Sequence, residues 1–326
     1  MGVRSTFRNG MGSILPSWMF GMRTDPCIRI FGDMSYNALQ SSVLRWFRLN
    51  ARDLAWRDPD TPAWGILLSE VMSQQTPVAR VEPIWLEWMA TWPTPQAFAE
   101  ASTDEVLRAW GKLGYPRRAL RLLECARVIV DKHGGRVPDT VDELLALPGI
   151  GDYTARAVAA FAFGQNVPVV DTNVRRVYRR AVEGRFLQGT ASKKELVDVA
   201  AILPADSGPE FSAGIMELGA LICTATSPKC ASCPLLELCE WQRLDCPAPS
   251  EEELASAKKR VQKFTGTDRQ VRGLIMDVLR GAEAPVAKSA IDVVWPDEAQ
   301  RSRALFSLLS DGLAEQDADG NFHLPR

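Results

Sequence analysis

The sequence predicts an all-α protein that ends in a small winged-helix-like domain. Over the first two thirds of the 326 residues, apolar side chains recur at helical spacing, and turns bearing Pro or Gly separate the periodic segments. No segment in that part alternates between apolar and polar residues as a half-buried strand does. The last part instead combines three periodic segments with a hairpin signal. These observations give the fold class and its division into domains.

The N-terminal residues 1–34 are expected to be a disordered extension. They contain Gly, Arg, Ser, Pro and several Met residues without helical or strand period, and Pro16 interrupts their apolar stretch. Alternatively, they precede a natural start near Met34. No chemistry is assigned to them.

Residues 35–246 are expected to form the main helical domain. From Ser35 onward, Leu39, Val43 and Trp46 recur at helix spacing. A loop rich in Pro, Asp and Arg then precedes the next helix, 63–76, on which Glu70 and a glutamine four residues later would share a face. Further helices are expected at 78–91, 94–100, 103–110, 116–133, 140–146, 152–163, 172–182, 192–202 and 208–222.

The C-terminal part divides into a linker and a domain. Residues 247–264 are polar and rich in Pro, Ser and Glu, which predicts a linker. Beyond it, 268–280, 288–294 and 298–311 have helical period, and 313–324 carries an Asp-Gly dipeptide at its middle. Three helices and a hairpin predict a winged-helix-like domain over 265–326.

Composition and cysteine usage indicate a soluble protein of a reducing compartment. The chain is 46% hydrophobic and 24% charged, and its most apolar helical run, 155–163, is short and carries Arg156. Outside one cluster, Cys27, Cys125 and Cys246 are scattered and give no disulfide framework. We therefore expect a cytoplasmic protein without a membrane partner.

Four cysteines with C-x6-C-x2-C-x5-C spacing indicate a metal centre. The two-residue gap brings two thiols to the same side of a tight turn, and the longer gaps close the loop. This pattern favours a 4Fe-4S cluster. Zinc is the alternative, although zinc modules usually pair two short knuckles and one is present here. The four ligands would be Cys223, Cys230, Cys233 and Cys239.

Charge is unevenly distributed along the chain. The formal net charge is −2, yet basic residues cluster over 112–136 and again over 175–185, while acidic residues gather at 245–253 and near the C-terminus. Such basic segments are typical of nucleic-acid contact, although solvated helix faces give the same pattern.

A glycine-bearing hairpin between two helical segments offers a phosphate site. The residues Leu147-Pro148-Gly149-Ile150-Gly151 precede a predicted helix. Two glycines allow a sharp turn and leave N–H groups at a helix N-terminus, where they bind a phosphate without a basic side chain. A plain helix–helix turn is the alternative. An aspartate, Asp171, follows the next apolar segment and leads into the arginine-rich helix, which favours the DNA-binding interpretation.

These residues carry a family resemblance. The hairpin, the Val-Asp171 segment and the four-cysteine loop together resemble the helix–hairpin–helix DNA glycosylase superfamily that includes endonuclease III. Within it, the segments 68–76 (LSEVMSQQT), 52–57 (RDLAWR) and 113–115 (LGY) are similar to the MutY-type adenine DNA glycosylases. The resemblance covers about residues 35–245 and implies a two-lobed, iron–sulfur-containing fold.

Two carboxylates suit the chemistry of N-glycosidic cleavage. The departing base needs a proton, and the developing sugar cation needs a nearby negative charge. Glu70, on a largely apolar helix, is the candidate acid, because burial raises the pKa of a carboxyl group. Asp171 is the candidate stabiliser or nucleophile, and it is also a candidate helix N-cap. The resemblance implies the same roles, with Glu70 also helping to activate water.

The resemblance assigns further site residues. Tyr153 stands where endonuclease III-like relatives carry the lysine that nicks the strand, so a monofunctional enzyme is expected. Asn173 resembles the residue that hydrogen-bonds near the catalytic aspartate. A flipped base needs a pocket, and a wedge must replace it in the duplex. The implied adenine pocket is Arg52, Leu54 and Trp56, and the implied wedge, which contacts the opposite base, is Gln74, Gln75 and Tyr115.

Three departures from the family are apparent. The usual Tyr-Tyr pair is Tyr115-Pro116, and a polar side chain often found ten residues before the first cluster cysteine is Ala213. The chain is also too short for the Nudix-like C-terminal domain that many members use to recognise 8-oxoguanine. Preference for 8-oxoguanine over guanine therefore rests on the resemblance alone.

The sequence thus predicts a monomeric, monofunctional DNA glycosylase of base excision repair that removes adenine mispaired with 8-oxoguanine or guanine in double-stranded DNA. One alternative is a thymine glycosylase for T:G mismatches, because related enzymes share the hairpin, Tyr153 and Asp171. Another is a DNA-binding protein without catalysis, against which the presence of both Glu70 and Asp171 argues. The cluster is expected to serve structure or DNA contact.

Overall fold

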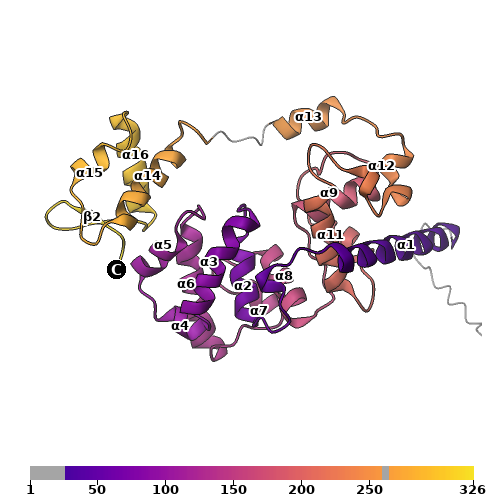
Figure 1. The fold of residues 1–326 in the computed structure, drawn as a ribbon, viewed down its shortest axis with the longest axis horizontal. Helices are drawn as coiled ribbons and strands as arrows, with labels where there is room; N and C mark the ends of the chain where they lie inside the picture. The colour runs from indigo at the N-terminus through magenta and orange to yellow at the C-terminus, as the bar shows by residue number, and fades with distance from the viewer. Residues whose placement is uncertain (1–25, 259–263) are drawn as a thin grey trace, which may run out of the picture.

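The computed structural model describes residues 26–258 and 264–326 and is predominantly helical (Figure 1). Two helical lobes and a C-terminal domain make up the described chain. The predicted all-α fold is therefore confirmed. No helix in these two ranges has both the length and the apolar character needed to cross a membrane.

The first lobe is formed by one continuous part of the chain. Its core contains a cluster of aromatic side chains, in which the ring centroids of Phe98 and Trp110 each lie within 5.7 Å of the ring centroid of Trp88. Aromatic rings bury large areas and favour such tilted contacts. The helices are α2 (Ala63–Met72), α3 (Val78–Thr91), α4 (Pro95–Ala99), α5 (Thr103–Trp110), α6 (Arg117–His133), α7 (Val141–Leu145) and α8 (Asp152–Phe163).

The second lobe joins the two ends of the main domain. A separate hydrophobic core forms where α1 packs against α11, with Leu39, Val43 and Phe211 buried between them. The α-helices are α1 (Pro26–Asn50), α9 (Thr172–Ala181), α10 (Lys194–Ala200), α11 (Gly208–Leu221) and α12 (Glu240–Arg243), and the short 3-10 helices η2 (Cys230–Ser232) and η3 (Leu236–Leu238) belong to the cysteine loop. A further 3-10 helix, η1 (Ala55–Arg57), lies in the connection from α1 to the first lobe.

The C-terminal domain contains the predicted three helices and hairpin. These are α14 (Asp268–Gly281), α15 (Lys288–Asp292), α16 (Glu298–Ser310) and the antiparallel strands β1 (Glu315–Gln316) and β2 (Phe322–His323). The domain packs beside α5 on the first lobe (Figure 1). Arg108 of α5 donates hydrogen bonds to the carbonyls of Arg280 and Ala282, and Arg280 donates to the carbonyl of Leu107 at 3.0 Å.

Two boundary predictions at the ends of the main domain are wrong. Helix α1 begins at Pro26, so residues 26–34, which were expected to be disordered, are helical, and residues 1–25 lie outside the described chain. The expected linker also contains a helix, α13 (Glu251–Lys258). Its start is a capping box, in which Ser250 and Glu253 exchange hydrogen bonds of 3.1 and 3.2 Å. Residues 259–263 of that linker are not described.

Helix α2 is shorter than predicted. It was expected to reach residue 76 but ends at Met72, with Ser73 as its C-cap. The guanidinium of Arg118 donates hydrogen bonds of 2.7 to 3.2 Å to the carbonyls of Val71, Met72 and Gln74. These bonds satisfy acceptors that the end of a helix leaves free. Glu70 and Gln74 therefore do not share a helix face.

Candidate active site

A cavity of about 710 Å³ gathers most of the predicted catalytic and base-pocket residues. It lies where α2 and α8 of the first lobe face α9 and α11 of the second. Residues far apart in the sequence thus meet at one place, although α2 alone supplies the candidate acid. The predicted residues that line the cavity are Arg52, Leu54, Trp56, Glu70, Tyr153, Asp171 and Asn173.

Glu70 is a buried carboxyl group that keeps its proton to an unusually high pH. Burial raises its pKa from the ordinary value of 4.5 to about 7. A hydrogen bond from the Tyr153 hydroxyl and the charge of Arg57 lower the pKa of Glu70, while the nearby charge of Asp171 raises it. The balance leaves a carboxylic acid that can donate a proton near neutral pH.

Asp171 is fixed by hydrogen bonds at the start of α9. One carboxylate oxygen accepts the N–H of Val174 at 2.7 Å, and the other accepts the side-chain amide of Asn173 at 2.8 Å. The aspartate is therefore a helix N-cap, as its position in the sequence allowed. Burial raises its pKa, and these hydrogen bonds act in the opposite direction. The cavity thus holds a second carboxyl group in a different, hydrogen-bonded environment.

Tyr153, in the first turn of α8, presents a hydroxyl group to this cavity. Burial and the two neighbouring carboxyl groups, Glu70 and Asp171, raise its pKa well above 10.0, so the phenol stays protonated and donates to Glu70. A phenol has no amine and therefore cannot form a Schiff base. The side chain at this position therefore serves hydrogen bonding.

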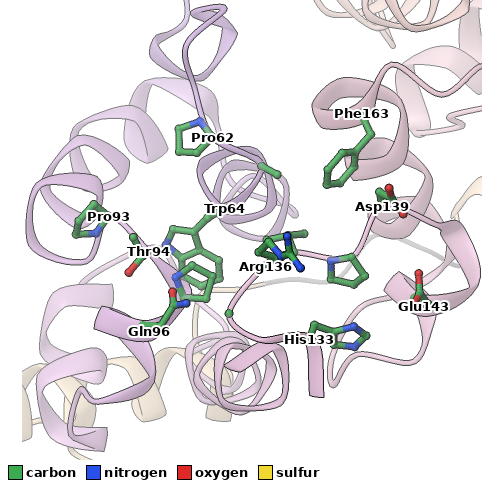
Figure 2. A pocket seen from close by; sticks show the side chains of 15 residues that line it. Pro62, Trp64, Pro93, Thr94, Gln96, His133, Arg136, Asp139, Glu143 and Phe163 are labelled. Carbon is green, nitrogen blue, oxygen red and sulfur yellow. The ribbon is translucent and has the colours of Figure 1, made fainter. Parts of the chain in front are cut away.

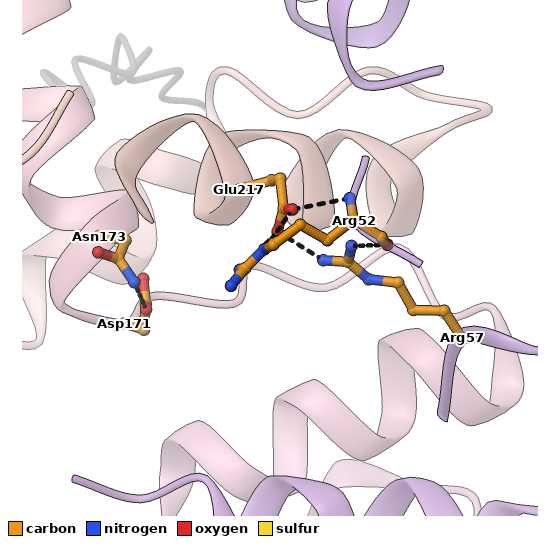
Figure 3. A network of polar contacts seen from close by, with 5 residues as sticks. All are labelled: Arg52, Arg57, Asp171, Asn173 and Glu217. Carbon is orange, nitrogen blue, oxygen red and sulfur yellow. Dashed lines mark hydrogen bonds and ion pairs between the residues drawn. The ribbon is translucent and has the colours of Figure 1, made fainter. Parts of the chain in front are cut away.

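A buried carboxylate, Glu217 of α11, holds the base-pocket loop in place. Arg52 donates to Glu217 through its backbone N–H, Nε and Nη2 at 2.7 to 2.9 Å, and Arg57 donates from Nη2 at 2.9 Å (Figure 3). Burial alone would raise the pKa of Glu217, but these hydrogen bonds lower it to about 2. We did not predict Glu217. Its signal was a carboxylate within the apolar stretch 211–221 of this helix, a residue type that is buried only when paired.

Replacing Glu217 with Gln is expected to loosen this loop. One neutral amide cannot accept four hydrogen bonds and leaves two guanidinium groups without a counter-charge, at a cost of about 2 kcal/mol in the free energy of unfolding. Urea denaturation measures the loss. The control is Glu210→Gln on the same helix, whose ion pair with Arg48 is more exposed and should contribute much less to stability. Equal effects of both substitutions would contradict the assignment.

The predicted wedge residues lie at the tips of two adjacent loops. Gln75 and Tyr115 both adopt left-handed backbone angles, with φ of 56° and 48°, which non-glycine residues rarely do. Both line a second cavity rather than the one that holds Glu70. Gln74 instead donates its amide to Thr154 at 3.1 Å, so of the two glutamines Gln75 projects to solvent.

Arg118 connects the two wedge loops through hydrogen bonds from its guanidinium. Besides the carbonyls at the end of α2, its guanidinium contacts Thr76 Oγ1 at 3.2 Å and the carbonyls of Leu113 and Gly114 at 3.2 and 3.0 Å. Burial lowers its pKa to about 10, so it remains charged at neutral pH. The sequence showed Arg118 only as one member of a basic segment, and no local pattern marked its role.

The glycine-bearing hairpin connects α7 to α8 as predicted. Leu147 and Ile150 are buried and anchor it, whereas Gly149 and Gly151 are exposed. Gly149 has φ of 76°, and a Cβ there would lie 2.8 Å from Cβ of Arg121. Gly151 is the N-cap of α8 and offers no side-chain cap, so the N–H groups of the first turn remain available to an anion.

The arginines of α9 serve internal contacts, contrary to the DNA-binding interpretation of this segment. Arg176 and Arg180 are buried, and Arg175 pairs with Glu195 at 2.7 Å. Arg179 pairs with Glu183 at 3.2 Å. All of these contacts are specific to the fold, and the pattern of charge alone could not reveal them.

The four predicted cysteine ligands surround one small cavity. Arg180 crosses beside it and donates to Cys223 Sγ at 3.3 Å and to the carbonyl of Thr224 at 2.7 Å. A donor aimed at sulfur suits a thiolate. In the described residues, no three His, Cys, Asp or Glu side chains converge tightly enough for a single metal ion, and the thiols enclose a space instead. Four thiolates around one space suit an iron–sulfur cluster. Cys223, Cys230, Cys233 and Cys239 all line the space.

The cysteine loop is connected to Asp171 by one arginine. Arg176 donates to the carbonyls of Cys223 and Gly219 and to Oδ1 of Asn173, each at 2.6 Å. Asn173 in turn donates to Asp171. The position of the Asp171 carboxylate is therefore linked to the cysteine loop through hydrogen bonds.

A further cavity lies away from all of these residues (Figure 2). It is open, and its lining combines Pro62 and Trp64 with the charged side chains of Arg136, Asp139 and Glu143. None of the predicted catalytic residues reaches it. We assign it no part in the chemistry.

Comparisons with known proteins agree with this geometry. The family model of the HhH-GPD superfamily base excision DNA repair proteins matches residues 68–196, and that of the iron-sulfur binding domain of endonuclease III matches residues 223–239. In solved structures, a thermostable thymine-DNA glycosylase aligns with a TM-score of 0.59 at 27% identity, over 65% of this chain and 98% of its own. The fold and the cavity thus define a base excision DNA repair protein of the HhH-GPD superfamily, with an iron–sulfur cluster at the four cysteines.

Curated relatives narrow the family. An adenine DNA glycosylase of Mycolicibacterium smegmatis is 57% identical over 284 residues, which cover 86% of this chain and 94% of the relative. One of Mycobacterium tuberculosis strain H37Rv is 54% identical over 288 residues, which cover 87% and 93%. The chain belongs to the adenine DNA glycosylase family.

Proposed function

We propose that this protein is a monofunctional adenine DNA glycosylase that hydrolyses the N-glycosidic bond of adenine mispaired with 8-oxoguanine or guanine. The observation that carries the proposal is the carboxyl of Glu70, which lines the same cavity as Asp171 and whose pKa burial raises to about 7. A thymine glycosylase for T:G mismatches is the competing activity, and the likeness to a solved thymine-DNA glycosylase favours it.

The two carboxyl groups, which lie in different environments, have different roles in the reaction. Glu70 donates its proton to a ring nitrogen of the flipped adenine, which makes the base a better leaving group. As the bond lengthens, positive charge develops on the sugar, and the carboxylate of Asp171 stabilises it. Glu70, now ionised, accepts a proton from the attacking water.

The side chains around these groups fix their orientation. Tyr153 donates to Glu70, and Asn173 donates to Asp171. Arg52 and Arg57, held by Glu217, form one wall of the base pocket. Because Tyr153 offers no amine, the base is released, the sugar stays in the strand as an abasic site, and the strand is not cut.

The cluster and the partners complete the proposal. When bound by the four cysteines, the iron–sulfur cluster cross-links the loop that Arg176 ties to Asn173. Double-stranded DNA binds with phosphates at the glycine-bearing hairpin and with Gln75 and Tyr115 at the mispair. The protein acts as a monomer in the cytoplasm, a location that the unpaired cysteines among the described side chains favour.

Single-turnover assays on labelled duplexes test the proposal. We expect base release from A:8-oxoguanine and A:G duplexes, with strand breaks only after alkali. Release of thymine from a T:G duplex, without release of adenine, would move the protein to the competing class. Breaks without alkali would mean that an amine forms a covalent intermediate, and the monofunctional assignment would be wrong.

The pH dependence of excision follows from Glu70. Its pKa of about 7 lies above the ordinary value, so the required protonated form is fully present well below pH 7 and is lost as the pH rises. Under subsaturating conditions the excision rate constant should therefore fall about tenfold per pH unit above about pH 7. Duplex affinity measured at each pH separates binding from chemistry. A profile that stays flat to about pH 9 would contradict the assignment of Glu70 as the acid.

A further inference from the structure

The wedge residue Tyr115 contacts both the glycosylase lobe and the C-terminal domain. On the lobe side, the guanidinium of Arg118 lies 5.7 Å from its ring centroid. On the domain side, Arg269, in the first turn of α14, lies over the same ring with its guanidinium carbon 4.1 Å from the centroid. The second contact is the shorter one and fits a cation–π interaction. It joins a predicted DNA-contacting residue to a domain of unassigned role.

The two arginines differ in what fixes the orientation of their guanidinium groups. Arg118 is committed to the carbonyls of both wedge loops, so its orientation is set by the backbone. Arg269 is exposed and forms no ion pair within the described part of the chain, although its guanidinium also lies 5.7 Å from the Phe264 ring. Its position is therefore governed by the aromatic rings that it contacts.

Tyr115 needs support, because its backbone is held in an uncommon conformation. Gly111 and Gly114 precede it with φ of 50° and 80°, and Tyr115 itself has φ of 48°. Non-glycine residues in this region are strained and persist when surrounding contacts fix them. The ring is also partly exposed, at 37%. A contact that holds the ring thus decides where it points.

The surroundings of this contact suit a DNA strand. A cavity of about 590 Å³ lies between the wedge loops and α14, and its lining includes six cationic side chains and two carboxylates. The segment from Gln75 to Arg80 separates it from the cavity of Glu70, since residues 76–78 line one and Gln75 and Arg80 the other. Excess positive charge attracts the phosphate backbone.

We propose that Arg269 is a positioning residue for the wedge. Its guanidinium holds the Tyr115 ring in the orientation from which the ring enters the duplex, so the C-terminal domain takes part in extruding the base. Arg269 acts through Tyr115 and needs no contact with the reacting atoms. The inference rests on the proposed function of Tyr115 as a wedge.

A double-mutant cycle tests this inference in the full chain. The variants are Arg269→Ala, Tyr115→Ala and their combination, each made together with Glu70→Gln so that no base is removed. The readout is the stopped-flow fluorescence of 2-aminopurine placed beside the adenine of an A:G duplex, which rises when the bases unstack. The control is Lys288→Ala in the same domain, whose side chain pairs with Asp292 at 2.8 Å.

We expect Arg269→Ala to slow unstacking about fivefold, as loss of one cation–π contact predicts, and to have no further effect when Tyr115 is already Ala. If Arg269→Ala matches the Lys288 control, the inference is overturned. It is also overturned if the effects of the two substitutions on the unstacking rate multiply in the double variant, because Arg269 would then act on DNA independently of Tyr115.

Excision assays with Glu70 intact separate this inference from the proposed function. If the unsubstituted protein releases no adenine but unstacking still depends on Arg269 through Tyr115, the proposed activity fails and the positioning role stands. If adenine is released and unstacking is indifferent to Arg269, the reverse holds.

Discussion

The Glu70→Gln variant is expected to bind mispaired DNA and to excise adenine about 1,000-fold more slowly than the unsubstituted protein, a loss typical of removing a general acid. Glutamine has nearly the same shape and can still accept the hydrogen bond from Tyr153, so the cavity should keep its form. It carries no proton of suitable acidity for the adenine ring. Single-turnover rate constants, with duplex affinity measured by gel shift, report the two properties separately.

A matched substitution guards against general effects of removing a glutamate. Glu87 is exposed on α3, far from the cavity, and Glu87→Gln should leave excision unchanged. If Glu70→Gln retains full activity while binding normally, the acid must be another group. The pH profile would then also have to arise elsewhere.

The Asp171→Asn variant is expected to lose excision by about 100- to 1,000-fold, the effect of removing one preorganised electrostatic group. Asn is an equally good helix N-cap, so it should still accept the N–H of Val174 and preserve the start of α9. The negative charge near the developing sugar cation is lost. Any decrease in rate can then be attributed to that charge.

The control for this substitution is another aspartate with the same structural role. Asp297 caps α16 in the C-terminal domain and accepts the N–H of Gln300 at 2.9 Å. Asp297→Asn should change neither the melting temperature nor the excision rate appreciably. Were Asp171→Asn as active as this control, the cap would be the whole function of Asp171.

The sequence predicted the helices well because their apolar period is local information. Prediction failed at a helix end that depends on a residue distant in the sequence. Helix α2 ends at Met72 because Arg118, from α6, takes its last carbonyls. By contrast, the start of α13 carried a local signal, the capping box of Ser250 and Glu253, that we overlooked.

The candidate site shows the same division. Glu70 and Asp171 were recognisable from their motifs, and both line the cavity. The role of Glu217 depends on two arginines about 160 residues away in the chain, and that of Arg176 on the cysteine loop. Charge patterning suggested that the arginines of α9 bind DNA, whereas burial and specific acceptors commit them to the protein interior.

The burial of Glu70 has a consequence for folding stability. In an unfolded chain this carboxyl ionises near its ordinary pKa of 4.5, but in the folded protein it resists ionisation until about pH 7. The folded state therefore loses stability as the pH rises between these values, and the loss is complete above pH 7. A glutamine at the same position escapes this penalty. The Glu70→Gln variant should melt at a higher temperature than the unsubstituted protein at alkaline pH, and this advantage should disappear in acid, so that the candidate acid is a residue without which the fold would be more stable.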